Sequence, residues 1–154
     1  MSKLEVGRNA PQFSLEGTGG RFSPGYATAG PLVVYFYPRD NTPGCAQEGG
    51  DFAAAYAQFR KANCRIVGVS ADSLAAHVRF KDKMSFPFDL LSDPGKQVCG
   101  LFDVIREKSM YGRKYMGIER STFLIDGKGV LRQAWRKVKV NGHAAEVLAA
   151  VKAL

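Results

Sequence analysis

The segment of residues 32–70 constrains the possible fold more than any other part of the sequence. Residues 32–37 form a continuous run of β-branched, aromatic and other apolar side chains that stops at Pro38, which is typical of a central strand buried on both faces. A helical segment begins at Cys45, and residues 64–70 have the composition of a second strand. A strand, a helix and a second strand in this order predict two parallel strands joined by a right-handed crossover.

Further strands and helices are indicated on both sides of this unit. They comprise a hairpin of residues 11–15 and 21–23 around a glycine-rich turn, a helix from Ser73 to Met84, a short helix around Val98, Leu101 and Phe102, a hairpin of residues 121–125 and 130–135 around the turn sequence DGKG, and a final helix over residues 144–154. This order predicts an α/β, thioredoxin-like fold: a central mixed β-sheet flanked by helices, with an N-terminal β-hairpin.

Length and composition indicate one domain over residues 1–154. The chain has 45% hydrophobic and 23% charged residues, which are ordinary values for a folded domain that needs no disulfide or metal to stabilise it. No apolar run approaches the roughly 20 residues that a membrane span requires. The N-terminus places Glu5 early and has no apolar stretch after it, unlike a secretory signal, so a cytoplasmic location is expected.

The net charge of +8 raises the question of acidic partners such as nucleic acid or an anionic membrane. The basic residues are dispersed, with mild clusters at residues 106–120 and 132–139, and no nucleic-acid motif accompanies them. A solvated basic surface is therefore the favoured interpretation, with neither nucleic acid nor membrane as a partner.

The three cysteines, Cys45, Cys64 and Cys99, are too few and too dispersed for a disulfide framework, and no two form a C-x-x-C motif. Together with His77 and His143 they show no metal-ligand spacing, and the glycine-rich loops lack nucleotide-binding patterns. We therefore expect no metal and no cofactor. The two histidines are expected to have surface or capping roles.

Cys45 has the placement of a reactive thiol. It follows a buried strand and a Pro-Gly turn and lies in the first turn of a helix, where free N–H groups and the helix dipole stabilise a thiolate. Thr42 can offer a hydroxyl to the sulfur or to a substrate oxygen, and Pro38 can shield the pocket from water. The pattern alone leaves open a buried, inert cysteine behind a helix-capping loop.

A resemblance to a known family favours a reactive Cys45 over a buried, inert one. The sequence PRDNTPGC at residues 38–45 resembles the P-x-x-x-T-x-x-C motif of peroxiredoxins, which are AhpC/TSA-like proteins of thioredoxin-like fold. Several colinear segments are similar to the bacterioferritin comigratory protein, or peroxiredoxin Q, subfamily: YFYP at residues 35–38, VGVS at 67–70, LLSD at 90–93, GIERSTFLID at 117–126, and WRKVKV at 135–140 followed by Gly142 and His143. Together they cover nearly the whole chain.

The resemblance implies a peroxidase that reduces hydrogen peroxide and organic hydroperoxides. Cys45 corresponds to the peroxidatic cysteine, which becomes a sulfenic acid. Thr42 corresponds to the residue that hydrogen-bonds the peroxide, and Arg120 to an arginine that stabilises the thiolate and the charge developing on oxygen. Pro38 belongs to the same motif. Glu48 matches a subfamily glutamate that organises the helix turn or Arg120, although a solvated position is equally open.

The residue that regenerates Cys45 is the main departure from the family pattern. The positions of the resolving cysteine in the subfamily are occupied here by Gly50 and by the segment of residues 79–81, which holds no cysteine. Cys64 is expected to pack in the core. Cys99 is expected to be more reachable, although its apolar neighbours favour packing too. The leading expectation is a one-cysteine cycle completed by an external thiol such as thioredoxin or glutaredoxin, in a monomer.

Other mechanisms and functions remain open at this point. They include a two-cysteine cycle with Cys99 or Cys64 as the resolving residue, a thioredoxin-like disulfide oxidoreductase, which the lack of C-x-x-C disfavours, and a redox-sensing or chaperone-like binding module. Gly49 and Gly50 weaken the first turns of the helix, since glycine costs roughly 1 kcal/mol against alanine there. This suggests that the oxidised Cys45 moves outward by local unwinding.

Overall fold

A computed structural model describes residues 4–25 and 30–154. Within these residues, seven strands form one mixed sheet in the order β2-β1-β5-β4-β3-β8-β9, and β6 pairs with β7 separately. The strands are β1 Leu15–Gly17, β2 Gly20–Phe22, β3 Leu32–Phe36, β4 Arg65–Ser70, β5 Asp89–Ser92, β6 Ile105–Met110, β7 Arg113–Ile118, β8 Ser121–Ile125 and β9 Leu131–Trp135. The helices are α1 Pro43–Ala54, α2 Tyr56–Lys61, α3 Leu74–Met84, α4 Gln97–Leu101 and α5 His143–Lys152. The α/β fold with a mixed sheet and flanking helices is confirmed.

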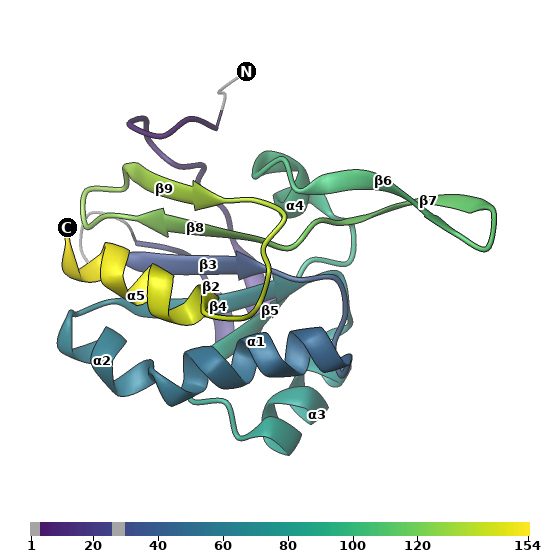
Figure 1. The fold of residues 1–154 in the computed structure, drawn as a ribbon, viewed down its shortest axis with the longest axis horizontal. Coiled ribbons are helices and arrows are strands. Elements are labelled where there is room, and N and C mark those ends of the chain that lie inside the picture. Colours follow the sequence, from purple (N-terminus) through teal and green to yellow (C-terminus); the bar gives the residue numbers. More distant parts are fainter. Residues whose placement is uncertain (1–3, 26–29) are drawn as a thin grey trace.

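Strand β3 lies inside the sheet and leads into α1 at its carboxyl end. It pairs in parallel with β4, with Val34 opposite Val67, and antiparallel with β8, with Val34 opposite Phe123. Every residue of β3 is buried, as its unbroken apolar run predicts. The loop that leaves β3 places the start of α1 near the start of β8, because Phe36 at the end of β3 pairs with Ser121 at the start of β8 (Figure 1).

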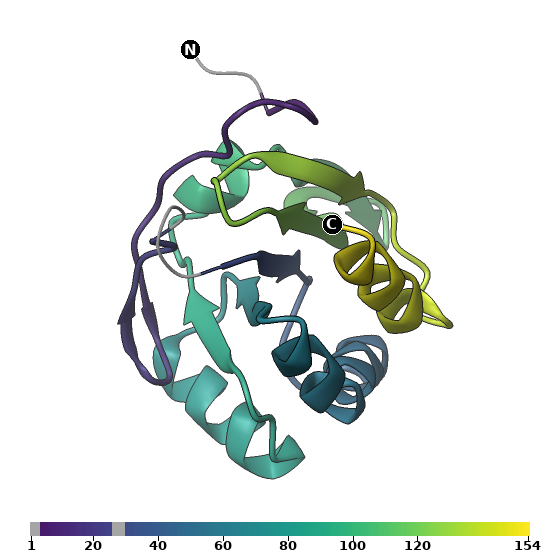
Figure 2. The same ribbon diagram turned by 90° about the vertical axis from the view of Figure 1, so that its left-hand side faces the viewer.

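Two hydrophobic clusters pack on opposite faces of the sheet. The side chains of Val33, Tyr35 and Tyr37 pack against residues from α1, α2, α3 and α5. The alternate side chains Leu32, Val34 and Phe36 pack against α4 and the segment before β1. In Figure 2 the yellow helix α5 and the blue helices α1 and α2 lie on the same side of the sheet. Because successive side chains of β3 point to opposite faces of the sheet, this strand contributes to both hydrophobic clusters.

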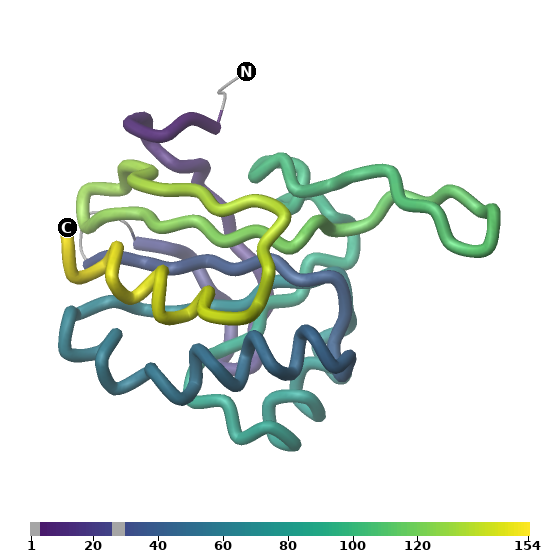
Figure 3. Tube along the Cα trace, in the orientation of Figure 1, coloured from purple at the N-terminus to yellow at the C-terminus, as the bar shows by residue number. Residues whose placement is uncertain are grey.

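The N-terminal β-hairpin is confirmed, but its first strand begins later than expected. Strand β1 starts at Leu15, whereas residues 11–15 were expected to form it. The segment before β1 runs beside the turn that joins β8 to β9, where Asn9 forms an isolated β-bridge with Val130 (Figure 3). Pro11 has no N–H to donate to a ladder, so the regular pairing starts beyond it. Residues 1–3, which were part of the argument against a secretory signal, lie outside the described residues.

The hairpin of β6 and β7 was not expected and extends away from the main sheet (Figure 1). It exposes large apolar side chains, namely Met110, Tyr111, Tyr115 and Met116. Its strands, IREKSM and RKYMGI, do not alternate apolar and polar residues, and most of their side chains are exposed or half-buried, so no apolar periodicity indicates them. None of the helices in the described ranges is long and apolar enough to cross a membrane.

Candidate active site

Cys45 lies in the first turn of α1, directly beyond the loop that leaves β3. Thr42 is the N-cap residue, Pro43 occupies the first helical position, and no side chain caps the helix. Pro43 favours a helix start because its fixed backbone angle suits that position and its missing N–H is not needed there. The Cys45 side chain is only 2% exposed. The sulfur is thus held at the positive end of a helix dipole and largely out of water.

Arg120 joins Cys45 to Glu48. It lies between β7 and β8, and the β3–β8 pairing brings it to the start of α1. Its Nη2 is 3.4 Å from Cys45 Sγ, and its Nη1 donates a hydrogen bond of 2.7 Å to Glu48 Oε1. Glu48 lies three positions after Cys45 on the same face of α1. One guanidinium therefore contacts both the sulfur and the carboxylate through separate nitrogens.

The surroundings of Glu48 disfavour its ionised form. The side chain is 1% exposed, and Oε2 is buried without a hydrogen-bond partner among the described residues. Burial raises the pKa of Glu48 to about 7, although the charge of Arg120 opposes this rise. Burial lowers the pKa of Arg120, but the negative charges of Glu48 and Cys45 outweigh it and the net pKa is raised. Arg120 thus remains a permanent cation beside the sulfur.

Ionisation of Glu48 is expected to weaken the folded state as pH rises. Its folded pKa of about 7 lies above the value of 4.5 that is usual for a glutamate in water, so the unfolded chain binds fewer protons between these pH values. The free energy of unfolding should therefore fall by roughly 2–3 kcal/mol from this group between pH 4.5 and 7. Urea unfolding of the wild type and Glu48→Gln at several pH values measures this difference. If the difference in the free energy of unfolding between the two proteins does not change with pH, the prediction for Glu48 is wrong.

Thr42 and Pro38 belong to the loop between β3 and Cys45 and are less buried than Cys45. The Thr42 hydroxyl donates a hydrogen bond of 3.0 Å to the carbonyl of Arg39, which holds the loop in a turn. Pro38 is exposed, and both residues line a cavity of about 880 Å³. The opposite wall of this cavity is the β6–β7 hairpin, including Met110, Tyr111 and Tyr115. The loop before α1 therefore faces an open space with a largely apolar wall.

Lys108 is one of the basic residues that line this cavity, and the sequence did not single it out. Its Nζ donates a hydrogen bond of 2.6 Å to the carbonyl of Ile118. Burial lowers the pKa of Lys108, and the neighbouring charge of Arg120 lowers it further. No local motif marks Lys108, because the pairing of β6 with β7 brings it there.

The other two cysteines are buried in separate parts of the core. Cys64 is 0% exposed, as expected for a packing residue, and burial raises its pKa to about 12. Contrary to expectation, Cys99 is not more reachable than Cys64: it is also 0% exposed, in agreement with the packing role that its apolar neighbours favour, and burial raises the pKa of its thiol. Cys99 faces the cluster of Leu32, Val34 and Phe36, whereas Cys45 and Cys64 face the opposite cluster. The sheet thus separates Cys99 from Cys45.

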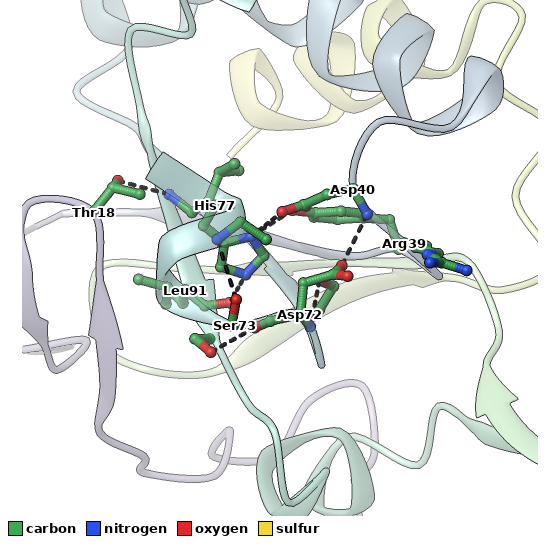
Figure 4. Close-up of polar contacts among 12 residues, drawn as sticks. Thr18, Arg39, Asp40, Asp72, Ser73, His77 and Leu91 are labelled. Carbon is green, nitrogen blue, oxygen red and sulfur yellow. Dashed lines mark hydrogen bonds and ion pairs between the residues drawn. The ribbon is translucent and has the colours of Figure 1, made fainter. Parts of the chain in front are cut away.

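The surface roles expected for the histidines are wrong, because both rings are buried. His77 is 0% exposed and lies beside Asp40, with 2.7 Å between Nδ1 and Oδ2 (Figure 4). His77 Nε2 lies 2.9 Å from the Leu91 carbonyl, and the Tyr37 hydroxyl donates a hydrogen bond of 2.6 Å to Asp40 Oδ1. His143 lies 2.8 Å from the Thr122 hydroxyl, and burial lowers its pKa.

Hydrogen-bond requirements show that the Asp40–His77 pair shares a proton. The Leu91 carbonyl only accepts, so His77 Nε2 must donate to it. The short contact between Nδ1 and the carboxyl group then needs a further proton, on either the ring or Asp40. Asp72 lies near both and could complete a cation site, but its Oδ2 accepts from the Ser70 hydroxyl and the Asp40 N–H. The cluster is therefore satisfied as a hydrogen-bond network that ties the loop after β3 to α3 and β5.

Comparison with known proteins bears on the identity of the chain. The sequence profile of the AhpC/TSA family matches residues 6–134. Peroxiredoxin Bcp of Xanthomonas campestris is 57% identical over 122 residues, which are 79% of this chain and 76% of that protein. Peroxiredoxin Bcp of Bacillus subtilis is 45% identical over 150 residues, covering 97% of this chain and 96% of its own.

A solved structure extends the agreement to the fold. The bacterioferritin comigratory protein of Xanthomonas campestris, described for its alkyl peroxide reduction activity, superposes with a TM-score of 0.89 at 47% identity, covering 97% of this chain and 98% of its own. Matches of this extent, together with a reactive-cysteine motif at the start of α1, leave one assignment. The chain belongs to the AhpC/TSA family, in its Bcp or peroxiredoxin Q branch, and is a thiol peroxidase that takes a hydroperoxide as substrate and a thiol as reductant.

Proposed function

We propose that Cys45 is the peroxidatic residue of a one-cysteine peroxidase within a single domain over residues 1–154. The observation that carries this proposal is the 3.4 Å contact between Arg120 Nη2 and Cys45 Sγ. A fixed cation and a helix N-terminus both stabilise a thiolate, which is the nucleophilic form of cysteine. Neither Cys64 nor Cys99 has such surroundings, since burial raises the pKa of each.

The proposed reaction uses the groups that surround the sulfur. The Cys45 thiolate attacks the distal oxygen of the hydroperoxide, a sulfur–oxygen bond forms and the oxygen–oxygen bond breaks. The leaving oxygen takes up a proton and departs as water or an alcohol, and Cys45 becomes a sulfenic acid. Arg120 stabilises the negative charge that moves onto oxygen, and Glu48 holds Arg120 in place. Thr42 and Pro38 form the edge at which the peroxide enters.

The apolar cavity beside Thr42 and Pro38 supports organic hydroperoxides as substrates besides hydrogen peroxide. Its walls include Met110 and Tyr115 of the hairpin, which can pack against an alkyl group. The related protein of Xanthomonas campestris is described for alkyl peroxide reduction. A higher kcat/KM for cumene hydroperoxide than for a more polar hydroperoxide of similar size is the result that supports this preference.

Burial of the other cysteines supports the one-cysteine cycle. Cys64 and Cys99 are both 0% exposed, and the sheet lies between Cys99 and Cys45. The sulfenic acid therefore needs a thiol from outside the chain, of the kind that thioredoxin, glutaredoxin or a small thiol supplies. A monomer in the cytoplasm, without a nucleic-acid partner, remains our prediction.

Mass spectrometry after one equivalent of hydrogen peroxide tests the assignment. With a sulfenic-acid trap present, the trapped label should map to Cys45 while Cys64 and Cys99 remain reduced. A disulfide between Cys45 and either of the others contradicts the one-cysteine cycle. An unmodified Cys45 contradicts its role as the peroxidatic residue.

Unwinding of the first turns of α1 is proposed to expose the oxidised Cys45. The structure changes how this can be tested, because a methyl group at Gly49 would collide with the ring of Phe86. A methyl group at Gly50 meets no atom within 4 Å. Gly50→Ala should stabilise the helix by about 1 kcal/mol and slow the reduction of the sulfenic acid by dithiothreitol about fivefold.

A matched control distinguishes local from general stabilisation. Gly100→Ala in α4 also meets no atom within 4 Å, so it adds the same methyl group to a different helix. Reduction should keep its wild-type rate in this variant. Equal rates for Gly50→Ala and the wild type contradict the unwinding step.

A further inference from the structure

A second cavity lies on the other side of the active-site loop. It has a volume of about 670 Å³, within the range of roughly 300–1,000 Å³ that is typical of small-molecule sites. Its walls come from the loop of residues 39–42 and from α3. Arg39 and Thr42 line both this cavity and the apolar cavity beside the hairpin. A ligand here is separated from the peroxide entrance only by the loop that precedes Cys45.

The cations of this cavity are available to a ligand. Arg39, Arg79 and Lys83 line it, and all three are exposed. The guanidinium groups of Arg39 and Arg79 have no hydrogen bond or ion pair to another described residue. Among the residues that the structure describes, Lys83 donates only to an amide oxygen, that of Asn41, at 2.8 Å.

The acidic groups of the cavity, in contrast, are already engaged. Asp72 Oδ2 accepts a hydrogen bond of 2.6 Å from the Ser70 hydroxyl and one of 2.8 Å from the Asp40 N–H (Figure 4). Asp40 accepts from Tyr37 and shares a proton with His77. The cavity therefore presents positive charge with few competing acceptors, which favours a small ligand that carries carboxylates.

We propose that this cavity binds the reducing thiol, as a small thiol of tripeptide size with two carboxylates. The inference rests on the proposed one-cysteine cycle, in which a thiol from outside must meet the oxidised Cys45. Thr42 is both the N-cap of α1 and part of the cavity wall. Unwinding of the first turn thus releases the chain carrying Cys45 at the edge of the cavity.

The reduction consists of two steps, condensation of a thiol with the sulfenic acid and then thiol–disulfide exchange. The sulfur of the bound thiol attacks the sulfenic sulfur of Cys45, a disulfide bond forms, and the sulfur–oxygen bond breaks. The oxygen leaves as water with the protons of the thiol and the sulfenic acid. A second molecule of the thiol then attacks the mixed disulfide, which releases the Cys45 thiolate and the oxidised, dimeric form of the small thiol.

Rapid mixing of the oxidised full-length protein with three thiols tests the proposal. Glutathione carries two carboxylates, 2-mercaptoethanol is neutral and cysteamine is cationic, and their rates are compared at equal thiolate concentration. The rate of mixed-disulfide formation should saturate with glutathione and exceed that with cysteamine about tenfold at low salt, an advantage that high salt removes.

Variants that each remove one positive charge test whether the faster reaction with glutathione arises in this cavity. Arg79→Gln and Lys83→Gln should each slow the glutathione step about threefold at low salt, the size expected of an exposed ion pair. Arg60→Gln removes an exposed guanidinium from α2, away from the cavity, and should match the wild type. The rate with 2-mercaptoethanol should not change in any of them.

The outcomes separate this proposal from the one on which it rests. A sulfenic acid on Cys45 that reacts equally fast with all three thiols, or that is insensitive to both Arg79→Gln and Lys83→Gln, overturns the binding site and leaves the peroxidase intact. Reduction by thioredoxin alone, without reaction with glutathione, also overturns it. Failure to form the sulfenic acid on Cys45 overturns the one-cysteine cycle itself.

Discussion

Replacing Cys45 by serine is expected to abolish peroxide reduction. The serine side chain has nearly the same shape as cysteine, so the arrangement of Arg120 and Glu48 beside residue 45 should persist. Its hydroxyl is far less acidic than a thiol and cannot form the sulfenic acid on which the cycle depends. The decrease of hydrogen peroxide with time, with dithiothreitol as reductant, should fall to the rate without enzyme.

The other two cysteines supply the control for this experiment. Cys64→Ala and Cys99→Ala should retain turnover within about twofold, although removal of a buried side chain costs each about 1–2 kcal/mol of stability. Thermal unfolding measured in parallel separates that cost from catalysis. Loss of turnover in folded Cys99→Ala, with an unchanged rate of Cys45 oxidation, would establish Cys99 as a resolving residue and end the one-cysteine interpretation.

Removal of the Arg120 guanidinium is expected to have the second largest effect. Arg120→Met loses the contact to Cys45 Sγ and leaves Glu48 buried without its cation. Loss of a donor that stabilises charge in the transition state typically lowers the rate about 100- to 1,000-fold, and we expect that range for kcat/KM with hydrogen peroxide. Stopped-flow measurement of Cys45 oxidation gives the rate without interference from the reduction step.

Arg120→Lys refines this prediction. Lysine keeps the charge but cannot reach the sulfur and the carboxylate with two nitrogens of one planar group, so only part of the rate should return. Arg60→Met in α2 serves as the control for loss of positive charge, because Arg60 is exposed and lies outside the site. A rate of Cys45 oxidation in Arg120→Met close to that of the wild type would remove Arg120 from the mechanism.

The sequence predicted a helix or strand correctly where a local pattern of residues determines its burial or its first residue. The unbroken apolar run of β3 indicated burial on both faces, and Ser73 indicated the start of α3, where its hydroxyl accepts from the Ala76 N–H at 3.1 Å. The β6–β7 hairpin was missed because it packs little of its surface and its apolar residues do not recur at a regular spacing. Exposed hairpins of this kind are specified by pairing and turn geometry more than by hydrophobic period.

The sequence identified the residues of the candidate site by their motif, but it did not show how deeply the side chains are buried or which long-range contacts they make. The order of residues 38–45 placed Cys45 at a helix start, but nothing local showed that His77 is fully buried, and the apolar neighbours of Cys99 indicated packing without showing that its thiol is inaccessible. His77 is a polar residue in a helix with charged neighbours, and only the long-range contacts to Asp40 and Leu91 make its burial possible. Gly49 likewise looked like a flexible position, whereas the ring of Phe86 requires it to be small.

The pairing of β3 with β8 also determines when the site first exists during synthesis. Cys45 and Arg120 are separated by 75 positions, and β8 joins the sheet directly beside β3. A nascent chain that ends before Arg120 already holds the thiol but not the cation that we propose activates it. On this proposal, full reactivity toward peroxide is expected late in biosynthesis, only when the C-terminal third of the chain has docked.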